Sequence, residues 1–157
     1  MSKFSLIAMG GTFDIIHHGH ITLLSTAFDI SEKVIIGLTS DEFVQKKGKN
    51  PIHKYDERLK NLTSIIFKKF PNSYFEISQL NNDFGPAVFE KEVQALVVSD
   101  ETKNQGNILN KLRTELNLPP VEVIVVPMFL AKDGVRISST RIKNSEIDSD
   151  GNLLPID

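Results

Sequence analysis

The sequence has no cysteine, no long apolar run and no excess of basic residues, and each absence excludes a class of function. Without cysteine the chain forms no disulfide, no zinc–thiolate site and no cysteine nucleophile. No apolar run is long enough to span a membrane and no signal peptide precedes the first apolar segment, so we expect a cytoplasmic protein without a membrane partner. A net charge of −2 provides no basic field, so nucleic acid is not an expected partner.

The composition fits one globular domain, with 157 residues of which 40% are hydrophobic and 24% charged. Apolar runs of strand length alternate with segments of helical periodicity, which is typical of a parallel sheet buried on both faces. The expected strands are 4–9, 33–39, 74–80, 94–99 and 121–126. One helix is expected after His20, a short one after Ser40, one over 55–70 and a short one that ends near Glu92. A further helix is expected to include 108–116, and the last to begin at Ser138 or Ser139. We therefore predict a single α/β domain over residues 1–157, a doubly wound five-stranded parallel sheet, with 146–157 as a flexible tail.

A glycine-rich turn follows the first expected strand. In a doubly wound sheet, ligands bind beyond the carboxyl ends of the strands, which is where this turn lies. Gly10, Gly11, Thr12 and Phe13 are expected to form a backbone cradle for a ligand, because glycine allows close approach. An ordinary strand-to-helix turn is the alternative, and Asp14 is expected to brace the loop.

Two histidines stand where the next helix begins. A helix N-terminus attracts anions, so His17 and His20 are expected to donate hydrogen bonds to phosphate and to stabilise developing negative charge. A metal site is disfavoured because no cysteine or carboxylate-rich cluster lies nearby in the sequence, and no metal ligand is assigned. A packing role is disfavoured because three histidines in four positions would be costly in a core. His18 is expected to be a bystander.

The series Gly-Gly-Thr-Phe-Asp-x-x-His-x-Gly-His, from Gly10 to His20, resembles the nucleotide-binding signature of the nucleotidylyltransferase superfamily. These enzymes also carry a late Ile-Ser-Ser-x-x motif, which is matched here by Ile137-Ser138-Ser139-Thr140-Arg141. The resemblance implies their Rossmann-like fold. The late motif is typical of a helix cap, and its amide and hydroxyl groups also suit the outer phosphates of a nucleotide. The residues expected there are Ser138, Ser139 and Thr140, with charge added by Arg136 or Arg141.

The end of the fourth expected strand and the residues after it indicate which branch of the superfamily the chain resembles. Val97-Val98-Ser99-Asp100-Glu101-Thr102 resembles the archaeal and eukaryotic phosphopantetheine adenylyltransferases, and the Arg-Gly-x-Arg of the bacterial enzymes is absent. Asp100 and Glu101 are accordingly expected to contact the nucleotide, with a helix cap as the alternative. In this family a lysine after the second strand binds the acceptor phosphate, which favours Lys47, or Lys46, over a purely solvated lysine loop.

The resemblance implies adenylyl transfer from ATP to 4′-phosphopantetheine, giving dephospho-coenzyme A and pyrophosphate. The expected partners are these substrates with Mg²⁺ accompanying the triphosphate, and dephospho-coenzyme A or coenzyme A as product or inhibitor. The acceptor phosphate attacks directly, so the catalytic residues His20, His17 and Lys47 need only hold and neutralise charge. Nicotinamide mononucleotide, FMN or glycerol phosphate are alternative acceptors, and a non-catalytic nucleotide sensor is the rival class. Superfamily members range from monomers to hexamers, and a monomer is favoured here.

Overall fold

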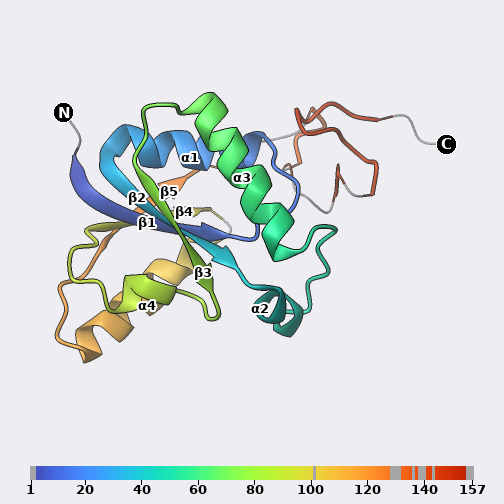
Figure 1. The fold of residues 1–157 in the computed structure, drawn as a ribbon. Coiled ribbons are helices and arrows are strands. Elements are labelled where there is room, and N and C mark those ends of the chain that lie inside the picture. The colour runs from blue at the N-terminus through green and yellow to red at the C-terminus, as the bar shows by residue number, and fades with distance from the viewer. Residues whose placement is uncertain are drawn as a thin grey trace.

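The computed structural model describes residues 3–100, 102–127, 132–135, 137, 141–142 and 144–154 (Figure 1). Within these ranges, five parallel strands form one sheet in the order β3-β2-β1-β4-β5, which confirms the predicted doubly wound α/β fold. The elements are β1 (Phe4–Gly11), α1 (His18–Ile30), β2 (Ser31–Thr39), α2 (Asp41–Lys46), α3 (Tyr55–Lys69), β3 (Phe75–Leu80), the 3-10 turn η1 (Gly85–Val88), β4 (Ala95–Ser99), α4 (Asn104–Glu115) and β5 (Glu122–Val126). No helix in the described ranges is both long and apolar enough to cross a membrane.

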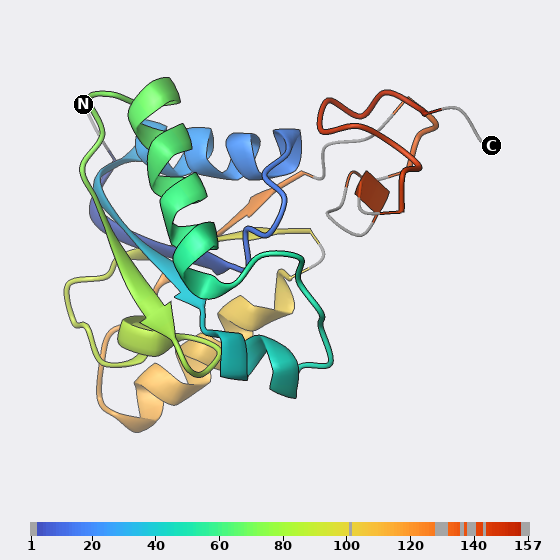
Figure 2. The same ribbon diagram turned by 45° about the vertical axis from the view of Figure 1, so that its right-hand side comes forward.

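Helices cover both faces of the sheet, as Figures 1 and 2 show. On one face α1 and α3 bury Leu24, Leu62 and Ile66 against the central strands. On the other face η1 and α4 bury Ala87 and Leu109. Because both faces are covered, the central strands β1, β2 and β4 are nearly continuous apolar runs, and this feature makes them recognisable in the sequence.

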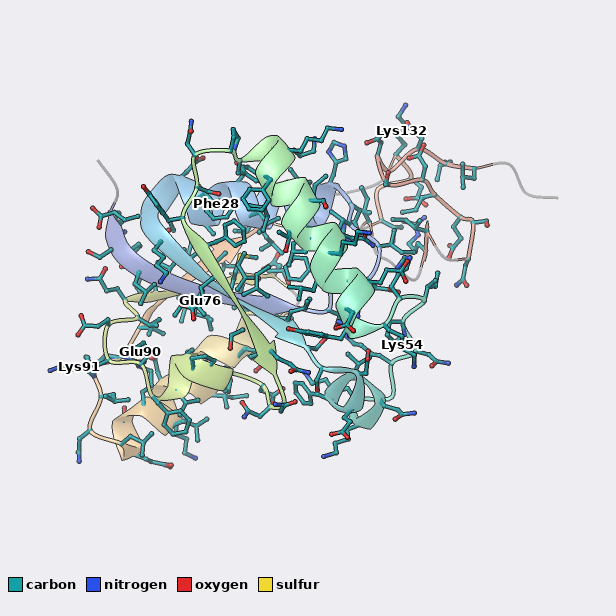
Figure 3. The ribbon with its side chains drawn as sticks, viewed as in Figure 1. Phe28, Lys54, Glu76, Glu90, Lys91 and Lys132 are labelled. Carbon is teal, nitrogen blue, oxygen red and sulfur yellow. The ribbon has the colours of Figure 1, made fainter. Side chains whose placement is uncertain are left out.

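An aromatic cluster closes the β3 edge of the first core. Phe28 of α1, labelled in Figure 3, lies with its ring centroid 5.2 Å from that of Phe70, at the end of α3, and 6.4 Å from that of Phe75, in β3. These ring separations are in the range of favourable aromatic contacts. The cluster therefore packs the C-terminal end of α1 against the end of α3 and against β3.

The structure corrects the expected bounds of two helices. The helix predicted to reach Glu92 is only the short turn η1, because the buried Arg113 donates to the carbonyls of Ala87 and Glu90 at 2.6 and 2.9 Å. Helix α4 begins at Asn104, earlier than predicted, since the preceding loop is closed by the Thr102 amide donating to the Ser99 carbonyl. Arg113 is thus a structural residue on the face opposite α1.

Residues 144–154 form a folded turn, where the sequence predicts a flexible tail from residue 146. Asp148 closes the turn by accepting hydrogen bonds from the backbone amides of Asp150 and Asn152, both at 2.9 Å. Ile147 is completely buried against Ile137. The acidic composition concealed this order, because the stabilising hydrogen bonds run from carboxylate to backbone within five residues.

Candidate active site

The glycine turn after β1 lies at the centre of the sheet, where the strand order reverses between β2 and β4. Gly10 and Gly11 end β1, and a Cβ at Gly11 would lie 3.0 Å from Cε2 of Phe13. Phe13 itself has a left-handed backbone, with φ of 49°, and its ring is buried. Left-handed geometry costs energy in a residue with a Cβ, so burial of the ring holds the turn in this shape.

His17 caps helix α1. Its backbone is extended, and its Nδ1 accepts a hydrogen bond of 3.0 Å from the Gly19 amide. A Cβ at position 19 would lie 2.8 Å from Cε1 of His17, which explains why glycine separates the two histidines of the motif. The side chain of His17 is buried and therefore held in one orientation.

His20 completes a reciprocal cap. Its Nδ1 accepts a hydrogen bond of 3.2 Å from the His17 amide, and the two imidazole rings stack with centroids 4.0 Å apart. The ring of Phe13 lies on the other side, with a centroid distance of 4.9 Å. Burial, and secondarily the neighbouring His17, lower the pKa of His20 from 6.5 to about 3, so His20 is neutral at physiological pH.

These hydrogen bonds assign the same tautomer to both histidines. An Nδ1 that accepts a backbone N–H carries no proton, so the ring proton of His17 and of His20 is on Nε2. Each ring is therefore fixed through one nitrogen and is a hydrogen-bond donor through the other. Two N–H donors side by side at the start of a helix can bind phosphate oxygens.

Arg58, which the sequence analysis missed, lies directly beneath the glycine turn. It is completely buried, and its guanidinium donates to the Thr12 carbonyl at 3.0 Å, to the His53 carbonyl at 3.1 Å and to Asp41 Oδ1 at 3.0 Å. It also lies 3.4 Å from Oγ1 of Thr39. One side chain thus joins the ends of β1 and β2 to the starts of α2 and α3.

Asp14 braces the turn, as expected. Its carboxylate accepts hydrogen bonds of 2.9 Å from the backbone amides of Ile52 and His53, and Nδ1 of His53 lies 3.1 Å from Oδ1. The carboxylate is buried and fully engaged with the loop that precedes α3. Asp14 and Arg58 therefore hold the turn from two sides.

A cavity adjoins the glycine turn on the η1 face of the sheet. Its walls are mainly apolar, with a single carboxylate from Asp83; the other lining residues include Gly10, Gly37, Leu80 and Phe84. The ammonium group of Lys47 lies 2.9 Å from Oδ1 of Asp83 and 4.7 Å from the centre of the Phe43 ring. The structure thus places the predicted acceptor-binding lysine in an ion pair at the edge of this cavity.

The remaining predicted nucleotide contacts are described only in part. Asp100 follows β4, is exposed, and has Lys103 Nζ at 3.9 Å from its Oδ1. Arg141, an alternative source of positive charge for the late motif, forms an ion pair with Asp133, and its Nε lies 3.6 Å from Oε1 of Glu146. The predicted residues that lie outside the described ranges are Glu101, Arg136, Ser138, Ser139 and Thr140.

Comparison with known proteins places this site in a family. The cytidylyltransferase-like family model matches residues 8–145. The phosphopantetheine adenylyltransferase of Pyrococcus horikoshii is 40% identical over 155 residues, which cover 98% of both chains. The bifunctional phosphopantetheine adenylyltransferase/NTP phosphatase of Thermoplasma acidophilum is 42% identical over 149 residues, and the aligned chain spans only 45% of that protein.

A solved structure shares the fold. A protein of unknown function from Archaeoglobus fulgidus superposes with a TM-score of 0.70 and 27% identity, covering 78% of this chain and 89% of that one. The family match includes the glycine turn, both histidines and the late motif. The chain therefore belongs to the cytidylyltransferase-like family and, within it, to the archaeal-type phosphopantetheine adenylyltransferases.

Proposed function

We propose that the protein transfers the adenylyl group of ATP to 4′-phosphopantetheine, producing dephospho-coenzyme A and pyrophosphate. The observation that carries this proposal is the pair of stacked histidines, each fixed through Nδ1 and each carrying its proton on Nε2. Neutral donors of this kind suit a reaction in which negative charge develops on phosphate oxygens. The names of the relatives supply the acceptor.

The chemistry is a single displacement at phosphorus. An oxygen of the acceptor phosphate forms a bond to the α-phosphorus of ATP, and the bond from that phosphorus to the bridging β-oxygen breaks. The electron pair of the broken bond leaves with pyrophosphate, so the protein supplies no nucleophile. Its residues position two anions and neutralise charge in the transition state.

We assign the two ends of the triphosphate to different parts of the site. His20 and the turn of Gly10, Gly11, Thr12 and Phe13 are proposed to bind the α-phosphate, because Arg58 and Asp14 hold that turn rigidly. His17 is proposed to bind the outer phosphates. The contacts proposed from the resemblance are Asp100 and Glu101 for the nucleotide, and Arg136, Ser138, Ser139 and Thr140 for the outer phosphates.

The acceptor phosphate is proposed to bind beside the glycine turn, on the side of Lys47. Lys47 would bind this phosphate after exchanging its Asp83 partner. The ion pair is partly exposed on both sides, so the exchange costs little. This assignment places the attacking phosphate next to the turn that holds the α-phosphate.

Mg²⁺ is proposed to enter with ATP rather than to reside on the protein. The carboxylate in the turn, Asp14, does not fit as a metal ligand, because both its oxygens already accept backbone hydrogen bonds. The phosphate oxygens of ATP are hard ligands of the kind that Mg²⁺ prefers. The cation therefore belongs to the substrate complex.

The test is pyrophosphate release from Mg²⁺-ATP with 4′-phosphopantetheine, nicotinamide mononucleotide, FMN or glycerol 3-phosphate in separate reactions, each beside a His20→Ala control. Turnover with 4′-phosphopantetheine alone, lost in the variant, is the expected result. Turnover with another acceptor would replace the substrate but keep the mechanism. ATP binding without turnover in any reaction would instead make the protein a nucleotide sensor.

A further inference from the structure

The turn formed by residues 144–154, called here the C-terminal turn, contacts the first turn of α1. Oδ1 of Asp150 lies 2.6 Å from Nε2 of His18, and the His18 amide donates to the Ser149 carbonyl at 3.3 Å. His18 stands between the two histidines of the proposed phosphate site. Figures 1 and 2 show this segment, in red, beside the junction of β1 and α1.

The C-terminal turn is rigid enough to transmit a position. Asp148 accepts three hydrogen bonds, from the amides of Asp150 and Asn152 and from the Asn152 side chain at 3.0 Å. The bonds from Asn152 hold the pKa of Asp148 below its ordinary value. The Leu154 amide donates to the Glu146 carbonyl at 3.0 Å, and Ile147 pairs with Leu153 across the turn.

The same turn contacts the two described end residues of the late motif, Ile137 and Arg141. At the N-terminal end, Ile137 packs against the buried Ile147, and the nearby Lys132 amide donates to the Gly151 carbonyl at 2.9 Å. Lys132 is labelled in Figure 3. At the C-terminal end, the Glu146 amide donates to the Arg141 carbonyl at 3.0 Å. The turn therefore connects Ile137 and Arg141 to the start of α1.

We propose that Asp150 and His18 are positioning residues for ATP: through the C-terminal turn they fix Ile137 and Arg141, the first and last residues of the late motif, relative to the first turn of α1. This inference rests on the proposed function. It gives His18, expected to be a bystander, a role in joining two motifs that stand at opposite ends of the sequence.

The direction in which Asp150→Ala changes ATP affinity distinguishes a positioning role from simple charge repulsion. Asp150 is a carboxylate beside a proposed phosphate site, so its removal should tighten ATP binding if only Coulomb repulsion matters. The positioning role predicts the opposite. Asp150→Ala should raise the dissociation constant and the KM for ATP about 3- to 10-fold, the size of one partly exposed charge-assisted hydrogen bond. The kcat and the KM for 4′-phosphopantetheine should stay unchanged.

Four further variants make the test more specific. Asp150→Asn keeps an oxygen that accepts from His18 and should bind ATP nearly as the parent protein does. His18→Ala should weaken ATP binding as Asp150→Ala does, and the double variant should be no weaker than either single variant, because the two residues act as one unit. Glu115→Ala, at the exposed end of α4 on the opposite face, is the charge-matched control and should leave ATP binding unchanged.

ATP binding is measured by calorimetry with Mg²⁺-ATP and no acceptor, alongside thermal unfolding of each variant. Unchanged or tighter binding by Asp150→Ala, with the parent protein binding ATP, would overturn the positioning role and leave the proposed function intact. Additive losses in the double variant would also overturn it. Failure of the parent protein itself to bind ATP would reject the proposed function and this inference together.

Discussion

Replacing His17 by asparagine should separate its two roles, capping α1 and donating a hydrogen bond to phosphate. The cap uses Nδ1, which accepts from the Gly19 amide at 3.0 Å. Asparagine is among the best N-cap residues, and its side-chain oxygen can accept the same amide hydrogen bond. It has no group at the position of Nε2, so His17→Asn keeps the cap and loses the phosphate donor. His17→Ala loses both.

The expected magnitudes differ enough to be measured separately. Loss of an N-cap costs about 1 kcal/mol, so His17→Ala should lower the free energy of unfolding by that amount, and the melting temperature by about 2–4 °C. His17→Asn should stay within about 0.3 kcal/mol of the parent protein, because asparagine caps as well as the best residues do. Loss of a preorganised donor to developing negative charge costs about 10²–10³ in kcat, and both variants should show this loss.

Urea denaturation measures the first quantity, and pyrophosphate release with ATP and 4′-phosphopantetheine measures the second. If His17→Asn keeps kcat within about threefold of the parent value, His17 does not donate a hydrogen bond to phosphate in the transition state, because the loss expected for such a donor is far larger. If His17→Asn is destabilised as much as His17→Ala, the capping role of the His17 side chain is refuted. As the control for folding, the parent protein, His17→Asn and His17→Ala should each unfold in a single cooperative transition.

Three other substitutions or conditions test the site. Acidification from pH 6.5 towards 3 should lower the free energy of unfolding by up to about 1.4 kcal/mol per pH unit through His20, because its pKa falls to about 3 on folding and only the unfolded state binds the proton in this range. In urea unfolding at several pH values, His20→Asn should show a smaller dependence of the free energy of unfolding on pH, and an equal dependence would contradict this. Arg58→Met should cost about 3 kcal/mol in urea unfolding, because the partly exposed carboxylate of Asp41 and two carbonyls lose their buried donor. A cost below about 1 kcal/mol would refute this role. Gly19→Ala, which would stabilise an ordinary helix by up to about 1 kcal/mol, should instead reduce kcat in the pyrophosphate assay, because its Cβ would displace the His17 ring; parent-like activity would count against the assigned geometry.

The sheet was predictable because its signals are local. The strand of residues 33–39 was expected from an unbroken β-branched run, and β2 includes it with two further residues at its start. The Ser40 cap was equally readable, since its side chain accepts from the Phe43 amide three residues later. Strands buried on both faces are apolar along their length, which explains why the fold class could be predicted from the alternation of apolar runs and helices.

The interactions that hold the site together join residues far apart in the sequence, and these were not predictable. Arg58 resembles any polar residue on a surface helix, and its burial depends on acceptors from three other segments, including Thr12 and Asp41. The pairing of Lys47 with Asp83 and of His18 with Asp150 likewise requires knowledge of which loops meet. The motifs identified the side chains that we propose bind the ligand, whereas the side chains that support them appear only in the structure.

The stereochemistry of transfer tests the central claim most directly. Incubating the protein with 4′-phosphopantetheine and the Sp diastereomer of ATP thiolated at the α-phosphorus should give thio-substituted dephospho-coenzyme A with inverted configuration at phosphorus, because the acceptor attacks in a single displacement. Retained configuration would require a covalent intermediate on the protein and contradict the mechanism. Absence of any dephospho-coenzyme A product, with ATP still bound, would contradict the proposed activity itself.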